Sequence, residues 1–116
     1  SILGGASSSL VIGQTIRNND IIDGSAIGLG FSVNNIEMAK GAVIYERTTS
    51  YGRGKLNFAL SNAIDNTTAA TLADTKMTIL NNGNVGIGQT TPTAVLHIKA
   101  GTATASTAPL KLTVEH

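Results

Sequence analysis

Large apolar residues alternate with small or polar residues along several short stretches of the chain. The clearest stretch runs from Ala26 to Val33, where Gly28, Gly30 and Ser32 separate the apolar side chains. Successive side chains of a strand point to opposite faces, so this pattern predicts a strand with one apolar face and one nearly bare face. A bare face allows another backbone to approach closely.

Similar patterns predict strands in the rest of the chain. Leu56, Phe58 and Leu60 alternate with smaller or polar residues, and Val85 and Ile87 flank a glycine. Less regular stretches rich in β-branched and aliphatic residues also favour strands. Further strands are therefore expected at 42–46, 77–80, 95–99 and 110–114, the last of them with one apolar and one solvated face.

Turn-forming residues separate these runs. The strongest signal is Asn81-Asn82-Gly83-Asn84, because Asn and Gly tolerate the positive φ of a tight hairpin. It predicts a hairpin from Met77 to Ile87. Helix is expected only in two short stretches, at 34–40 and 68–74. The sequence thus predicts an all-β fold with little helix.

The composition favours thin layers over a thick globular core. Aromatic residues make up 3% of the chain and Trp is absent, so Ala, Val, Ile and Leu must supply most of the buried surface. With 116 residues the chain is expected to form a main β domain at 1–92 and a C-terminal part at 93–116. The C-terminal part contains a Thr/Ala/Ser-rich stretch at 101–108, which is expected to be an extended linker.

The two ends of the sequence suggest a segment of a longer chain. It starts at Ser1 instead of Met and ends in Val114-Glu115-His116. His116 fits the start of an affinity tag as well as a natural residue, and it is left out of the functional argument.

Charge and cysteine content exclude several function classes. Charged residues are 13% of the chain, about half the usual share, and the net charge is +1. Scattered Lys and Arg do not form the basic patch that nucleic acid requires. The absence of Cys excludes disulfides and thiolate metal sites. Membrane insertion is not expected, because no apolar run approaches the roughly 20 residues that span a bilayer.

Candidate catalytic chemistry is sparse, and the sequence predicts no enzyme, no cofactor and no bound metal. His97 is the internal histidine, and its expected strand points it away from Leu96 and Ile98. It is expected to face solvent or to bond between chains, the alternative being a metal ligand. Asp20 and Asp23 are the pair of carboxylates closest to a glycan-cleaving arrangement, and turn formation explains them better.

Tyr51, Arg53 and Lys55 form the one polar cluster with binding character. An exposed Tyr beside Arg could stack on a sugar ring or donate to its hydroxyl groups. The alternative is a hairpin tip whose side chains pack between chains. The three residues are therefore candidate receptor contacts.

One long run resembles a segment of bacteriophage tail fibre proteins. It extends from Asn82 to Ile98 and contains a turn, a Gly-Asn-Val-Gly-Ile-Gly strand, a Thr-Thr-Pro corner and a Leu-His-Ile strand. The preceding residues from Gly41 to Phe58 are similar to the segment that comes before it in that family. Residues 1–40 resemble the family only in their general character and contain no matching motif.

The resemblance implies an elongated, intertwined parallel homotrimer, like a β-prism or a triple β-helix, within a virion. Its implied role is structural, in a viral tail fibre that supports host attachment and adhesion. The implied partners are neighbouring fibre segments and, at a receptor-binding fibre tip, a bacterial surface glycan or protein. A glycan-hydrolysing tailspike is the second alternative. The self-cleaving chaperone domain that often follows in the family does not occur within this chain.

The residue pattern favours association for a separate reason. Narrow apolar stripes on a single thin sheet would stay exposed, whereas several copies could bury one another, and folding would then be coupled to assembly. The residues expected in the trimer core are Ile27, Leu29, Phe31, Leu56, Phe58, Val85 and Ile87.

Overall fold

The computed structural model describes residues 3–4, 10–33 and 38–114, and these form an almost entirely β structure. Strand accounts for 34% and helix for 3%, which confirms the predicted fold class at this level. The elements are β1 (Leu3–Gly4), β2 (Val11–Ile12), β3 (Ala26–Phe31), β4 (Gly41–Arg47), β5 (Gly54–Leu60), the 3-10 turn η1 (Leu72–Asp74), β6 (Thr75–Leu80), β7 (Val85–Ile87) and β8 (Leu96–Ile98).

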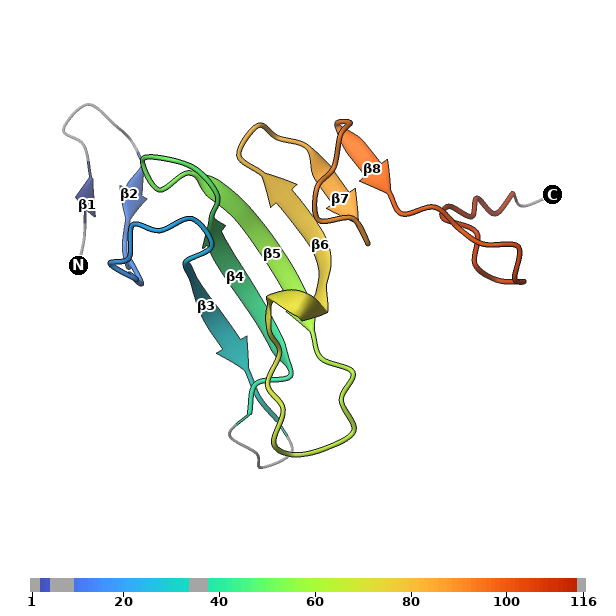
Figure 1. The fold of residues 1–116 in the computed structure, drawn as a ribbon, viewed down its shortest axis with the longest axis horizontal. Coiled ribbons are helices and arrows are strands. Elements are labelled where there is room, and N and C mark those ends of the chain that lie inside the picture. The colour runs from blue at the N-terminus through green and yellow to red at the C-terminus, as the bar shows by residue number, and fades with distance from the viewer. Residues whose placement is uncertain (1–2, 5–9, 34–37, 115–116) are drawn as a thin grey trace.

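Strands β3 to β8 form one six-stranded sheet in their order along the chain (Figure 1). Neighbouring strands from β3 to β7 are antiparallel, whereas β7 and β8 are parallel. Strands β1 and β2 form a separate antiparallel pair at one end of the molecule, and residues 100–114 lie beyond β8 at the other (Figure 1). The sheet thus lies between two extensions.

The hairpin predicted from Met77 to Ile87 is confirmed. β6 and β7 pair there, and Gly83 has a φ of 96° in the connecting turn. The turn is closed by two bonds of 2.9 Å, from the Gly83 N–H to the Leu80 carbonyl and from the Leu80 N–H to the Asn84 carbonyl. Gly fits this position because its φ region strains residues that carry a Cβ.

The sheet has a covered face that buries polar side chains. Asn57 and Thr78 are 1% and 0% exposed, and they lie opposite each other on β5 and β6. The Thr78 hydroxyl donates to Asn57 Oδ1 at 2.9 Å, and Asn57 Nδ2 donates to the Ile44 carbonyl at 3.3 Å. Among the described residues no buried side-chain N or O lacks a partner. Burial is therefore tolerated here because each polar group is bonded.

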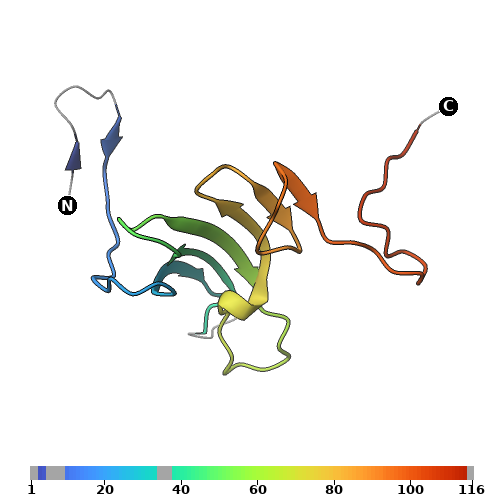
Figure 2. The same cartoon turned by 45° about the horizontal axis from the view of Figure 1, so that its top comes forward.

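The connection from β7 to β8 covers part of this face. Pro92 is buried, and the Lys55 ammonium donates to the Thr90 carbonyl at 3.2 Å. Gly86 lies beneath the same turn, where a Cβ would overlap the Gln89 carbonyl. η1 contacts β5. The loop between β5 and η1 lies below the sheet in the view of Figure 2. The chain thus covers one face of the sheet with its own connections.

We expect Gly86→Ala to lower the free energy of unfolding by about 1 to 3 kcal/mol, because the added methyl group must displace the backbone at Gln89. Urea unfolding followed by circular dichroism measures the change. Gly13→Ala is the matched control, since a Cβ at Gly13 meets nothing within 4 Å. Equal midpoints for the two variants would contradict the tight packing of this turn.

Two sequence-based predictions were wrong, and a third is confirmed only in part. Residues 110–114 do not form a strand, because no described strand lies beside them to pair with. The expected linker at 101–108 is not extended: the Thr107 hydroxyl donates to the Thr102 carbonyl at 3.0 Å and closes a turn. The short helix considered possible at 68–74 is present only as the single turn η1, which Thr71 and Asp74 cap reciprocally.

Two further predictions meet the structure only in part. The short helix expected at 34–40 falls largely on residues 34–37, outside the described part of the chain. β8 follows Pro92 and pairs with β7, so the sheet continues across the expected boundary between 1–92 and 93–116. None of the described helical segments is long and apolar enough to cross a membrane.

Candidate association surface

The strand register collects most of the large apolar side chains of the sheet on one face, while Ile44 and Leu80 lie on the other. Directly paired residues of neighbouring strands share a face, and the pairs include Leu29 with Val43 and Val43 with Phe58. The same rule extends the set to the far edge through β6, β7 and β8. We call this set the apolar face, and it comprises Ile27, Leu29, Phe31, Val43, Tyr45, Leu56, Phe58, Leu60, Met77, Ile79, Val85, Ile87, Leu96 and Ile98.

The apolar face is open in the single chain. Leu29, Phe31 and Leu60 are 52%, 57% and 60% exposed, whereas Asn57 and Thr78 on the opposite face are almost fully buried. The covered face also buries Ile44 and Ala59, but most of the large apolar side chains lie on the open face, whereas in an ordinary half-buried sheet the apolar side is the covered one. Exposed apolar patches rimmed by polar residues mark interaction surfaces. The face is therefore the principal candidate site.

All the residues expected in the trimer core lie on the apolar face. Ile27, Leu56, Phe58 and Val85 are partly buried within the single chain, and Leu29, Phe31 and Ile87 are exposed. Their burial between copies stays a prediction. The sequence-based set omitted other members of the face, such as Val43, Ile79 and Leu96. Their own segments alternate less regularly, and only the pairing register assigns them to this side.

A hollow lies at one end of the apolar face, across β3, β4 and β5. It has a volume of about 260 Å³. The residues that line it are apolar: Phe31, Val43, Phe58 and Leu60 belong to the apolar face, and Ala42 and Ala59 are their neighbours along β4 and β5. Without a charged or hydrogen-bonding side chain in its lining, the hollow suits an aliphatic side chain better than a polar ligand.

The other end of β4 and β5 carries the hairpin tip, where polar groups are already paired. The Tyr45 hydroxyl donates to the Gly52 carbonyl at 2.8 Å and ties the tip to the sheet. The Arg47 guanidinium is paired with the Asp23 carboxylate. The apolar face is therefore bordered at this end by polar groups that are bonded to each other.

The structure separates the three candidate receptor contacts. Tyr51 is 93% exposed at the hairpin tip and has a φ of 63°, a left-handed conformation that bulky residues rarely adopt. The Arg53 guanidinium donates to the Ser50 carbonyl at 3.1 Å, which keeps it at the tip. Lys55 lies within β5 and is held by the Thr90 carbonyl. Tyr51 and Arg53 thus both lie at the hairpin tip, whereas Lys55 is not part of that group.

The residues considered for catalysis have structural partners. His97 Nδ1 accepts a bond of 3.2 Å from the Thr93 N–H within the β7–β8 connection. Asp23 is occupied by Arg47, and the Asp20 N–H donates to Asn18 Oδ1 at 3.0 Å in a local turn. Within the described part of the chain no group of three or more His, Cys, Asp or Glu is arranged to hold a metal ion.

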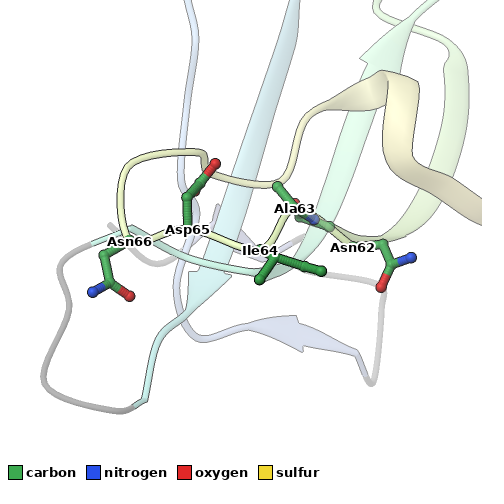
Figure 3. Close-up of a pocket in the computed structure, with 6 residues that line it drawn as sticks. Asn62, Ala63, Ile64, Asp65 and Asn66 are labelled. Atoms are coloured by element: carbon green, nitrogen blue, oxygen red, sulfur yellow. The ribbon is translucent and has the colours of Figure 1, made fainter.

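A second hollow, in the loop at 61–66, is shallow and lined by both polar and apolar residues. Figure 3 shows the side chains of Asn62, Asp65 and Asn66 pointing in different directions instead of converging. Asp65 accepts bonds from the Thr68 hydroxyl, from the Thr67 and Thr68 N–H groups and from the Lys40 ammonium. The bonds from Thr68, Lys40 and Thr67 hold the pKa of Asp65 well below its usual range. The carboxylate thus organises its own loop.

No protein-family model matches the chain, and no curated protein matches it. Arguments about function therefore rest on the residues and the geometry above.

Proposed function

We propose that this chain is a structural segment of a viral tail fibre, of the bacteriophage type, in which three copies associate through their apolar faces. The observation that carries the proposal is a six-stranded sheet whose apolar face is open while its polar face is covered. The number three comes from the resemblance of the run 82–98 to tail fibre proteins. The proposed protein is non-enzymatic and needs no cofactor.

The physical argument concerns the free energy of exposed apolar surface. Burial contributes about 25 cal/mol per Å² of apolar area, and stable interfaces remove roughly 800 Å² per partner from water. The apolar face runs across the full width of the sheet, from Ile27 on β3 to Ile98 on β8. Copies packed on this face would remove its exposed Leu, Ile and Phe side chains from water, and assembly would stabilise the fold of each copy.

Low surface charge also supports a scaffold. The chain has eight Lys and Arg against seven Asp and Glu, so three copies in one fibre accumulate little net charge. Several of these charges are neutralised locally, as in the ion pairs of Lys40 with Asp65 and of Arg47 with Asp23. Repulsion between copies would therefore be weak.

The decisive measurement is the mass in solution. We expect multi-angle light scattering on the purified chain to give a mass of about three times 11.8 kDa, with cooperative unfolding that depends on protein concentration. The concentration dependence follows because dissociation exposes the apolar face. A folded monomer that persists at high concentration would overturn the proposal.

A receptor-binding tip is the second candidate function, and the exposed, left-handed Tyr51 favours it. We expect Tyr51→Ala combined with Arg53→Ala to leave the trimer mass unchanged, because neither side chain belongs to the apolar face. A pull-down with host bacterial cells then separates the two functions. A tip would lose cell binding in this variant and keep it in the exposed-loop control Asn62→Ala, whereas a scaffold would behave alike in both.

A glycan-hydrolysing tailspike is not favoured. Such an enzyme needs two carboxyl groups about 5 to 9.5 Å apart, one of them free to act as an acid. No described contact prepares the pair considered from the sequence for this chemistry: the Asp23 carboxylate is paired with Arg47, and Asp20 forms a turn with Asn18 through its backbone N–H. Hydrolysis therefore does not enter the proposed function.

A further inference from the structure

The C-terminal arm, residues 109–114, is an apolar ribbon without a partner strand in the described chain. Leu110, Leu112 and Val114 are 63%, 80% and 73% exposed, and they alternate with Lys111 and Thr113. The arm lies away from the sheet in both views of the fold (Figures 1 and 2). It has the pattern of a half-buried strand whose apolar side faces water.

The apolar face and the arm have matching surface chemistry. The hollow between β3, β4 and β5 is lined entirely by apolar residues, and it is open. An extended segment with aliphatic residues at every second position could place them against this face and keep Lys111 and Thr113 in water. A charged or polar partner would find no complementary group in the hollow.

We propose that the arm of one copy packs on the apolar face of a second copy, with Leu110, Leu112 or Val114 filling the hollow beside Leu60. The inference rests on the proposed association of copies. It specifies which segment is exchanged between them.

The chain's own geometry disfavours packing of the arm on its own sheet. The Thr102 and Thr107 hydroxyls lie 2.9 Å apart, so the turn between them adds almost nothing to the span. About seven residues remain between Ile98 and Leu110, which reach roughly 25 Å when fully extended. Leu60 on β5 lies three strand spacings from β8, about 14 Å at roughly 4.8 Å per strand, so the link is long enough for self-packing. What disfavours self-packing is the direction of the arm, because the turn carries it away from its own sheet (Figures 1 and 2).

Exchange of arms also explains how copies could be held in register. The donor surface, the arm, differs from the acceptor surface, the hollow, so each contact is head-to-tail. Contacts of this kind form a closed ring when the rotation between copies closes, and three copies would each donate one arm and accept one. The ring would fix the position of each copy along the shared axis.

Engineered disulfides in the full-length chain test the exchange. The native chain has no Cys, so an introduced pair contains the only thiols. We expect Leu60→Cys combined with Leu110→Cys, Leu112→Cys or Val114→Cys to give covalent dimers and trimers on non-reducing denaturing gels in at least one of the three pairs. A disulfide requires Cα atoms about 4.4 to 6.8 Å apart, so bonding reports close approach.

The matched controls place the second thiol on the polar side of the arm. Leu60→Cys with Lys111→Cys or Thr113→Cys should form no more covalent oligomer than Leu60→Cys alone. An intramolecular disulfide, seen as a monomer of altered mobility, would overturn the exchange, and so would the absence of any disulfide in all three test pairs.

Light scattering on the native and reduced proteins separates the two proposals. A trimer without cross-links overturns the exchange alone, and a native monomer overturns the proposed association itself.

Discussion

Replacing both Leu29 and Phe31 with Asp is expected to convert the assembled protein into a monomer of lower stability, because assembly contributes to the stability of each copy. Both residues lie on the apolar face, and they are 52% and 57% exposed in the single chain, so the carboxylates remain hydrated when the chain is alone. Within an assembly they would be desolvated without a partner, at a cost of several kcal/mol for each ion. The association constant should therefore fall by a factor of about a thousand or more.

Sedimentation velocity measures the assembly, and circular dichroism reports whether the sheet is retained. Ile64→Asp is the control, since this side chain is fully exposed on the loop at 61–66, away from the apolar face, and its replacement should leave the mass unchanged. A variant at Leu29 and Phe31 that still assembles like the native chain would show that the apolar face is not the contact surface. A monomeric variant that also loses its β signal would agree with folding that is coupled to assembly.

Removing the buried amide of Asn57 is expected to cause the largest loss of stability from a single substitution outside the apolar face. Asn57→Ala leaves the Thr78 hydroxyl without its acceptor at a position that is 0% exposed. An unsatisfied buried polar group costs about 1 to 3 kcal/mol, and the cavity left by the side chain adds to this cost. Urea unfolding followed by circular dichroism should show the midpoint falling accordingly.

Replacing both polar partners distinguishes the hydrogen bond from the lost volume. Thr78→Val alone should also destabilise the fold, because it leaves Asn57 Oδ1 unpaired. Asn57→Leu combined with Thr78→Val removes both groups and should recover part of the loss, since an apolar pair of similar size leaves nothing unsatisfied. Asn62→Ala, on the exposed loop, should be neutral. Additive losses in the double variant would show that the two side chains are not coupled.

The sequence by itself determined the strands of the six-stranded sheet and the sidedness of those that alternate regularly. A period of two places alternate residues on one face whatever the partner strand is, and this suffices for Ile27, Leu29 and Phe31 on β3. The hairpin between β6 and β7 follows from Asn and Gly in its turn, because their backbone preference is local. Both predictions depend only on near neighbours along the chain.

Only the tertiary structure decided which face of the sheet is covered and which stays open. Alternation separates Asn57 from Leu56 but does not say that the connection over Gly86 covers the polar side, because that contact joins residues distant in sequence. The same limit explains the arm: Leu110 and Leu112 alternate as in a strand, yet a strand needs a neighbour for its backbone hydrogen bonds. Which strands pair and which face of the sheet is covered depend on contacts between distant parts of the chain, so a local pattern of residues cannot predict them.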